Sequence, residues 1–279
     1  MRFELHCHSN CSDGTEAPER VAARATERNV DVFALTDHDT CAGTQAARLP
    51  HGHSLRAVEI SCDEPKTGRT IHVLAYDRGG VGWGELETKL ADLRTARRNR
   101  MRMMAARLAQ RGIRVDVEPM IKDAESSGRT LGRPDLARLM LKAGAVTSMK
   151  EAFTRHLYDG GPVDVPHNAL ALPDALALGR SAYAAMSLAH PHLYDDLGVE
   201  LLKRHCGDGL EGVEAYYGAY HQGERKRWTE LADELGLVCT GGSDWHGPED
   251  PNAQIGIDFP DDRAKALTEW LGIGTNADW

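Results

Sequence analysis

The first predicted strand of this chain covers residues 2–5 (RFEL) and leads directly into the triplet His6-Cys7-His8. The two histidines are two residues apart, and in extended backbone this spacing places both imidazoles on one face. Cys7 then faces the other way, as expected for a small buried side chain. A strand that ends in two adjacent imidazoles indicates a candidate metal site.

The same arrangement, an apolar strand with a histidine or carboxylate near its end, recurs along the chain. Residues 32–36 form the second predicted strand, and His38 follows it. Further strands are predicted at 55–60, 70–76, 184–189, 211–217 and 237–240. Helical spacing is predicted at 18–28, 84–111, 134–143, 149–158, 173–181 and 224–235. Strands that alternate with helices favour a parallel sheet or barrel.

The middle of the chain has a different character. No strong strand pattern occurs between about residues 83 and 160, whereas Pro134 opens a predicted helix and Gly144 closes it. We therefore predict a helical insertion over residues 83–165, with a barrel formed by residues 1–82 and 166–279. The fold class is α/β, with four strands before the insertion and three after it.

The candidate metal ligands gather near the strand ends. The C-terminal ends of the strands of a parallel barrel converge on one mouth, so residues far apart in sequence would meet there. One histidine near a strand end is commonly an ordinary polar residue, but a set of six histidines and three carboxylates is hard to explain by packing. The set comprises His6, His8, Asp13, His38, Glu59, His72, His190, Asp244 and His246.

The donor types indicate which metals would bind. Mixed imidazole and carboxylate ligands without thiolate suit Mn²⁺, expected first, and also Fe²⁺ or Zn²⁺. Nine ligands exceed what one ion needs, so we expect two to three divalent ions. A bridging carboxylate could hold two ions roughly 3.5–4 Å apart, which is the spacing of two-metal hydrolases. Such a pair would activate a bridging water and neutralise a phosphoryl group.

Composition narrows the function classes. The chain has 279 residues and a net charge of −9, which argues against a surface that holds long nucleic acid. An anionic substrate remains compatible, because bound metals would supply local positive charge. The six cysteines form no CxxC pair, and neither a membrane-spanning run nor a signal pattern is present. We expect a cytoplasmic enzyme with no membrane contact and no obligate protein partner.

These motifs resemble the polymerase and histidinol phosphatase (PHP) family, in family order and over nearly the whole chain. The resemblance implies a distorted (β/α)7 barrel and a trinuclear metal centre. It also implies a metal-dependent hydrolase of phosphoric esters. The matching segments are His6-Cys7-His8, Thr36-Asp37-His38-Asp39, Glu59, His72, Ala189-His190-Pro191 and Gly242-Ser243-Asp244-Trp245-His246.

The resemblance also assigns the ligands to three metals. His6, His8, Glu59 and Asp244 would hold the first. Glu59 would bridge to the second, which His72 and His190 complete. Asp13, His38 and His246 would hold the third. Many family members have His in place of Asp13, and Asp at this position resembles the branch of nucleoside-3′,5′-bisphosphate phosphatases and short-RNA 5′–3′ exonucleases, which also carries a helical insertion.

Candidate substrate residues lie outside the ligand set. Within residues 132–138, the resemblance implies that Arg133 meets a substrate phosphate, although a surface arginine at a helix start is an equal alternative. Tyr217 could stack on a nucleobase or simply line the barrel rim. His221 could protonate a leaving oxygen. The arginines of residues 84–111 form either a solvated helix face or a funnel for an anionic substrate.

We expect a phosphomonoesterase that acts on a small nucleotide, such as a 3′,5′-bisphosphate. The alternatives are a 5′–3′ exonuclease on short RNA, a histidinol-phosphate phosphatase, a hydrolase of amides, and a non-catalytic metal-binding module. Two departures from the family pattern concern the substrate. Gly161 stands where a Lys is expected, and His190-Pro191 is followed by His192 rather than by Gly-Arg.

Overall fold

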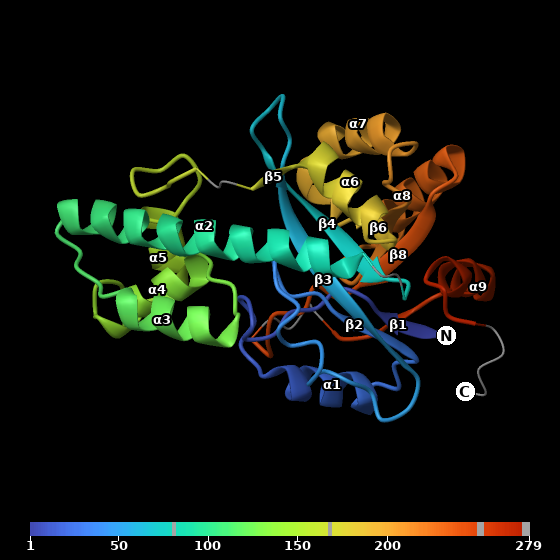
Figure 1. The fold of residues 1–279 in the computed structure, drawn as a ribbon, viewed down its shortest axis with the longest axis horizontal. Coiled ribbons are helices and arrows are strands. Elements are labelled where there is room, and N and C mark those ends of the chain that lie inside the picture. Colours follow the sequence, from blue (N-terminus) through green and yellow to red (C-terminus); the bar gives the residue numbers. More distant parts are fainter. Residues whose placement is uncertain (80–81, 167–168, 250–253, 275–279) are drawn as a thin grey trace.

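A twisted, nearly closed sheet forms the centre of the fold (Figure 1). The computed structural model describes residues 1–79, 82–166, 169–249 and 254–274. Within these ranges the sheet has nine strands in the order β8-β7-β6-β4-β3-β2-β1-β9, with β5 beside β3. Their bounds are β1 Arg2–Glu4, β2 Val32–Leu35, β3 His53–Asp63, β4 Thr70–Asp77, β5 Leu170–Ala171, β6 Ala184–Leu188, β7 Gly212–Tyr217, β8 Val238–Gly242 and β9 Ile257–Asp258.

The barrel closes where the segments that follow β1 and β8 run side by side. The Leu5 backbone N–H donates to the Gly241 carbonyl at 3.3 Å, and the Asp244 N–H donates to the His6 carbonyl at 2.7 Å. The predicted α/β barrel with an added helical region is confirmed. Of its seven longer strands, β1–β4 precede the helices of residues 83–165 in the sequence and β6–β8 follow them. The remaining strands, β5 and β9, have two residues each.

Strand β4 departs from the expected parallel arrangement. It runs antiparallel to both β3 and β6, whereas β1, β2 and β3 are parallel, as are β6, β7 and β8. The cause is the short connection of residues 64–69, because a parallel crossover needs a dozen or more residues. Since β4 is reversed, its first residues lie beside the last residues of β3, with His72 paired to Ser61.

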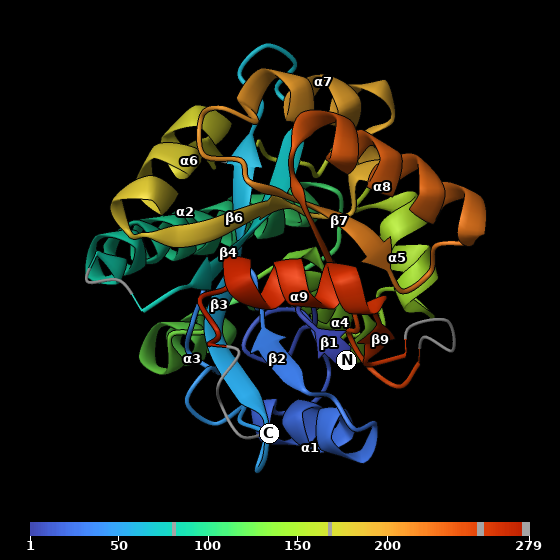
Figure 2. The ribbon, with the colours of Figure 1, turned by 90° about the vertical axis from the view of Figure 1, so that its right-hand side faces the viewer.

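Helices cover the outside of the barrel. Figure 2 shows α9 in front of the sheet, on the side remote from α2–α5. No helix in the described ranges is long and apolar enough to cross a membrane. The covering helices are α1 Pro18–Glu27, α6 Leu172–Ser181, the 3₁₀ turn η1 Pro191–Tyr194, α7 Asp196–His205, α8 Gln222–Leu235 and α9 Asp261–Trp270.

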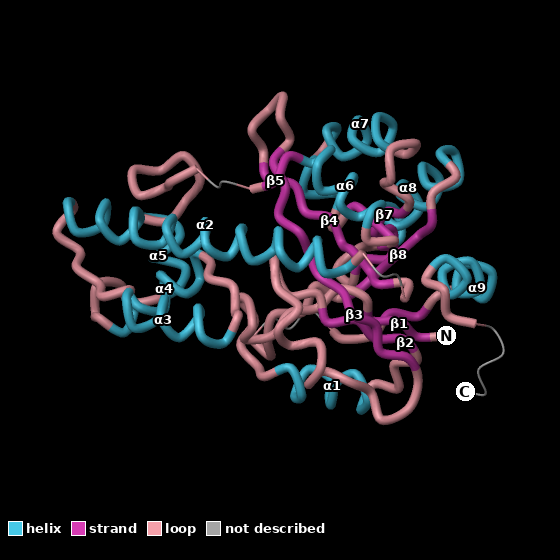
Figure 3. Tube along the Cα trace, in the orientation of Figure 1, coloured by secondary structure: helices cyan, strands magenta, loops and turns pink. Residues whose placement is uncertain are grey.

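The helices of residues 83–165 project from one side of the barrel (Figures 1 and 3). They are α2 Trp83–Gln110, α3 Glu118–Ser127, α4 Arg133–Lys142 and α5 Met149–Arg155. Helix α2 belongs to two hydrophobic cores. Leu86 and Leu90 pack in the barrel core, whereas Met104 and Leu108 pack with α3, α4 and α5 in a second core. The proposed domain boundaries at residues 83 and 165 stay a prediction.

Candidate metal centre

The nine side chains that the sequence singled out lie together at one end of the barrel. They form four overlapping groups in which one ligand atom from each residue lies within 4.8 Å of the others. The groups are His8/Asp13/His38/His246, His6/His8/Asp244, His6/Glu59/His190 and His38/Glu59/His72. The reversal of β4 brings His72 to this end although it lies near the beginning of its strand.

Glu59 lies at the centre of the cluster and is almost fully buried. Its Oε2 atom lies 3.3 Å from His6 Nε2, 3.2 Å from His8 Nε2 and 3.0 Å from His38 Nδ1. Its Oε1 atom lies 3.0 Å from His190 Nε2 and 3.1 Å from His72 Nδ1. One carboxylate thus faces five imidazoles, three on one oxygen and two on the other, which is the geometry that a bridging ligand requires.

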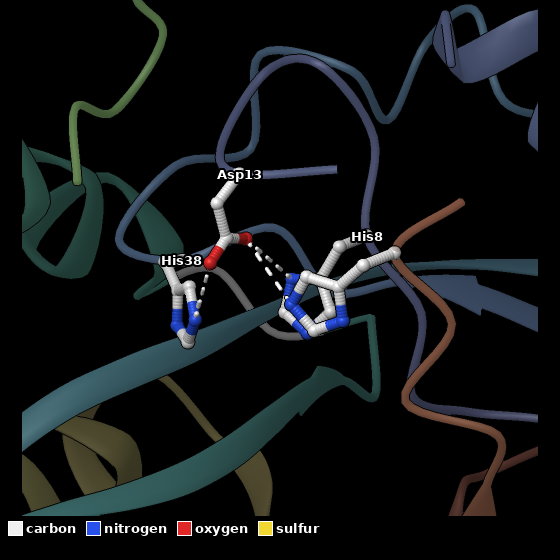
Figure 4. A group of neighbouring side chains, drawn as sticks. His8, Asp13 and His38 are labelled. Carbon is white, nitrogen blue, oxygen red and sulfur yellow. Dashed lines mark ion pairs between the residues drawn. The ribbon is translucent and has the colours of Figure 1, made fainter. Parts of the chain in front are cut away.

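Asp13 belongs to the loop after β1 and forms the outer edge of the cluster. Figure 4 shows its carboxylate between His8 and His38, at 3.9 Å from His8 Nδ1 and 3.7 Å from His38 Nε2. The nearest imidazole is that of His246, whose Nε2 lies 3.3 Å from Asp13 Oδ1. This outer group is more exposed than Glu59, so a substrate can approach it.

Asp244 occupies the remaining side of the cluster. Its Oδ1 lies 3.4 Å from His6 Nε2 and 3.2 Å from His8 Nε2. Asp244 has φ of 53° and His190 has φ of 29°, a region that non-glycine residues adopt rarely and often at functional sites. The backbone is therefore locally strained at Asp244 and His190, the two residues whose side chains point into the cluster.

The electrostatics of the cluster favour cations. Burial raises the pKa of the Glu59 carboxyl, but the imidazoles of His38, His6 and His72 outweigh burial and hold this pKa well below its usual range. Burial lowers the pKa of His8, yet the Asp244 and Glu59 carboxylates raise it to about 10. The Asp13 pKa is likewise well below its usual range, since nearby imidazoles outweigh its burial. The buried, ionised carboxylates thus favour the binding of protons or of other cations by the cluster.

Several inward-facing atoms lie at ion-pair distances from one another but make no hydrogen bond with suitable geometry. In the described part of the chain, these buried atoms include His6 Nε2, His8 Nε2, Asp13 Oδ1, His38 Nδ1 and Glu59 Oε2. Buried polar atoms normally have partners, so atoms without them that converge on one point fit metal ligation. Cys7 faces the opposite side and packs with Phe33 and Trp245, which leaves the donor set free of thiolate.

Glu214 in β7 is a buried carboxylate that was not predicted from the sequence as a site residue. Its two oxygens lie 2.9 and 3.1 Å from His6 Nδ1, and Oε2 accepts the His190 backbone N–H at 2.7 Å. It therefore orients one imidazole and fixes the backbone of another, as carboxylates behind metal-binding histidines do. An acidic residue between Val213 and Ala215 in a buried strand was the available signal.

Replacing Glu214 by glutamine should weaken metal binding about tenfold or more, because loss of such an orienting partner typically costs 10–100-fold in affinity. Isothermal titration with Mn²⁺ measures this directly. The matched control is Glu211→Gln, since Glu211 pairs with Arg78 outside the cluster. Equal Mn²⁺ affinities in the Glu214→Gln and wild-type proteins would contradict the orienting role.

The structure places the three candidate substrate residues at different points. Tyr217 donates its hydroxyl to Asp244 Oδ2 at 3.0 Å, and its ring packs against His192 with centroids 4.9 Å apart. Arg133 begins α4, donating to the Leu157 carbonyl and forming an ion pair with Asp159. His221 caps α8, where its ring accepts the Glu224 N–H. Their roles toward substrate stay predictions.

Comparison with known proteins links this geometry to phosphoesterases. A family model described as the PHP domain matches residues 4–77. The 3′,5′-nucleoside bisphosphate phosphatase of Chromobacterium violaceum is 30% identical over 91% of this chain and 90% of its own length. The phosphoribosyl 1,2-cyclic phosphate 1,2-diphosphodiesterase of Eggerthella lenta is 30% identical over 93% of this chain and 100% of its own length.

Two further matches agree with these relatives. The 5′–3′ exoribonuclease Rnm of Salmonella typhimurium is 29% identical over 88% of this chain and 85% of its own length. Among solved structures, one described as a metal-dependent phosphoesterase of Bifidobacterium adolescentis has a TM-score of 0.79 and 27% identity, and the match covers 96% of each chain.

Proposed function

Because this chain belongs to the PHP family of metal-dependent phosphoesterases, we propose that it hydrolyses a phosphate monoester of a small nucleotide, such as a nucleoside 3′,5′-bisphosphate. The observation that carries the proposal is the Glu59 carboxylate within 3.3 Å of five imidazole nitrogens, with Asp13 and Asp244 on either side. The residues present fit a cluster of two to three divalent transition metals, with Mn²⁺ as the first expectation.

We propose the following ligand assignment. His6, His8, Asp244 and Glu59 would hold the first metal. Glu59 would also hold the second metal, together with His72 and His190. Asp13, His38 and His246 would hold the third. Metals bound there would neutralise phosphate charge and lower the pKa of water. The protein's own groups would orient the ligands, with Glu214 behind His6 and the Tyr194 hydroxyl 3.2 Å from His190 Nδ1.

The nucleotide part of the substrate would be held by groups near the cluster. Tyr217, His192 and Tyr220 form an aromatic cluster beside Asp244, with the His192 and Tyr220 ring centroids 5.0 Å apart. Aromatic faces can stack on a base without selecting its identity. We propose that Arg133 binds a second phosphate and that residues 83–165 act as a cap. His221 remains the candidate for proton transfer to the leaving oxygen.

The relatives define the rival substrates. The first rival substrate is a 5′-phosphorylated short RNA, because the chain is similar to a 5′–3′ exoribonuclease. The second is a cyclic phosphate, because the chain is similar to a phosphoribosyl 1,2-cyclic phosphate 1,2-diphosphodiesterase. Histidinol phosphate would make no use of the aromatic cluster. We propose a cytoplasmic location because the six cysteines are all free, as is usual in a reducing compartment.

An activity screen with Mn²⁺-reconstituted protein tests the proposal. We expect the highest kcat/KM on nucleoside 3′,5′-bisphosphates, lower values on nucleoside monophosphates, and release of inorganic phosphate. Preference for a 5′-phosphorylated trinucleotide, with mononucleotides as products, would favour the exonuclease. If none of these compounds, nor histidinol phosphate, were hydrolysed to inorganic phosphate or to mononucleotides, the proposed activity would be overturned.

Metal content gives an independent prediction. Purified protein, or protein reconstituted with Mn²⁺, should carry two to three equivalents per chain, because nine ligand side chains converge in four groups. Elemental analysis of the dialysed protein measures this number. One equivalent or less after reconstitution would contradict a multinuclear centre.

A further inference from the structure

The helices of residues 83–165 contact the barrel at the two loops that carry Asp13 and His38. The Thr130 backbone N–H donates to the Cys11 carbonyl at 2.8 Å, and the Thr40 hydroxyl donates to the Gly128 carbonyl at 2.8 Å. Both loops belong to the outer ligand group, His8/Asp13/His38/His246. Within the candidate metal centre, these contacts therefore reach the outer ligand group; α2 also packs on the barrel core through Leu86 and Leu90.

Arg97 of α2 makes the contact on the His38 side. Its Nε donates to Asp39 Oδ2 at 2.7 Å, its Nη2 donates to the Ser61 hydroxyl at 2.7 Å, and its Nη1 donates to the Leu131 carbonyl at 3.3 Å. Asp39 is fully buried and accepts the Ser61 N–H at 2.8 Å through Oδ1. Through Arg97, Asp39 is thus linked to Ser61 of β3, two residues after Glu59. The same guanidinium links Asp39 to Leu131, which precedes α4.

The backbone around Asp39 depends on this support. Asp39 has φ of 51°, its N–H donates to the Glu59 carbonyl at 2.9 Å, and its carbonyl accepts Arg94 Nη1 at 2.9 Å. A left-handed aspartate persists only when its surroundings hold it. The backbone next to His38 is thus held by hydrogen bonds from both α2 and β3.

Arg138 and Arg129 make the contact on the Asp13 side. Arg138 Nη2 donates to the Asp13 carbonyl at 2.9 Å, and Arg129 Nη2 donates to the Ser12 carbonyl at 3.2 Å. Both guanidinium groups also contact the buried carboxylate of Asp135, at 3.4 and 2.7 Å. Asp135 caps α4 by accepting the Gly132 N–H at 2.8 Å, so the loop that carries Asp13 is tied to the beginning of that helix.

We propose that Arg97 and Arg138 are positioning residues for the outer ligand group, so that the helices of residues 83–165 set the affinity of the third metal, the one assigned to Asp13, His38 and His246. This inference rests on the proposed function. The inner ligands are held differently, because Glu214, Tyr194 and Tyr217 come from the barrel itself. Loss of an arginine contact therefore affects one metal and spares the others.

The test uses Arg138→Met and Arg97→Lys in the full chain. When Arg138 is replaced, the buried Asp135 keeps its 2.7 Å ion pair with Arg129, so no buried charge is left unpaired. Arg97→Lys retains a positive charge against the buried Asp39. Stepwise Mn²⁺ titration by calorimetry should show the Kd of one metal raised about tenfold and the Kd of the others within twofold, since a lost orienting partner costs 10–100-fold. The control is Arg102→Met, because Arg102 pairs with Glu118 away from the barrel.

A double-mutant cycle with His246→Ala localises the effect. If Arg138 acts through the outer group, Arg138→Met should add no further loss of Mn²⁺ once His246 is removed. Unchanged Kd values in both arginine variants, or an equal weakening of all metals, would overturn the inference. These outcomes differ from failure of the proposed function, which would appear as a wild-type protein that binds one Mn²⁺ or none.

Discussion

The Glu59→Gln variant is expected to lose at least ~10³ in kcat, because metal activation of water supplies most of the catalysis and Glu59 is the proposed bridge. Its two oxygens face three and two imidazoles respectively, so an amide would present a nitrogen donor to one side of the cluster. Two metals would weaken at once. Steady-state kinetics with the best phosphomonoester substrate, alongside elemental analysis, measures both effects.

A matched control separates this effect from loss of any glutamate. Glu87→Gln changes a half-exposed residue that pairs with Arg56 on the outside of the barrel, and it should leave kcat and metal content unchanged. If Glu59→Gln retains more than a tenth of wild-type kcat, Glu59 does not bridge the metals. Loss of kcat with full metal content would place Glu59 in the chemistry but not in the metal cluster.

The sequence predicted the convergence of the nine residues, but for His72 it did so without the correct strand direction. His72 was placed within a strand assumed to run parallel, where a position near the beginning would lie far from the mouth. The short connection of residues 64–69 reverses β4 and brings His72 beside Ser61 and within reach of Glu59. Connection length was a usable signal, because six residues cannot hold a crossover.

The partner behind His6 could not be inferred from spacing. Glu214 of β7 contacts His6 although the two residues are 208 positions apart in the sequence. Tyr194, by contrast, follows His190 by only four residues, in the turn that His190 opens. Three helices were also not predicted, α3, α7 and α9. Length does not explain the difference, because α1, α4 and α6 also have ten residues and were predicted.

The arginines of α2 illustrate how tertiary contacts can give a run of basic residues a role that neither interpretation of the sequence included. A run of basic residues on a helix was compatible with a solvated face or with a funnel for anions. In the structure, Arg94 and Arg97 bind Asp39, and Arg100 binds Asp164 and the Val165 carbonyl. Their charge is largely committed to holding helices and barrel together, which leaves Arg133 as the guanidinium proposed for substrate.

Arg133 is expected to bind a substrate phosphate rather than a metal. It lies at the first turn of α4, where the helix dipole favours an anion. Its ion-pair partner Asp159 is 85% exposed, so a phosphate could replace that carboxylate at little cost. Loss of one charge-assisted contact costs roughly 1.5–3 kcal/mol, or about a 10- to 150-fold loss in kcat/KM.

The decisive comparison is between Arg133→Ala and Asp159→Asn. If Arg133 serves only its pair with Asp159, both variants break the same contact and should have equally small effects on kcat/KM. If it binds phosphate, Arg133→Ala should lose about 10- to 150-fold on a nucleoside bisphosphate, and Asp159→Asn should retain or gain activity because the guanidinium is released. The loss in Arg133→Ala should shrink for an analogue without the second phosphate, and metal content should stay constant. Equal losses on both substrates would remove the second-phosphate role, and unchanged kinetics would leave Arg133 with its structural contacts to Leu157 and Asp159 alone.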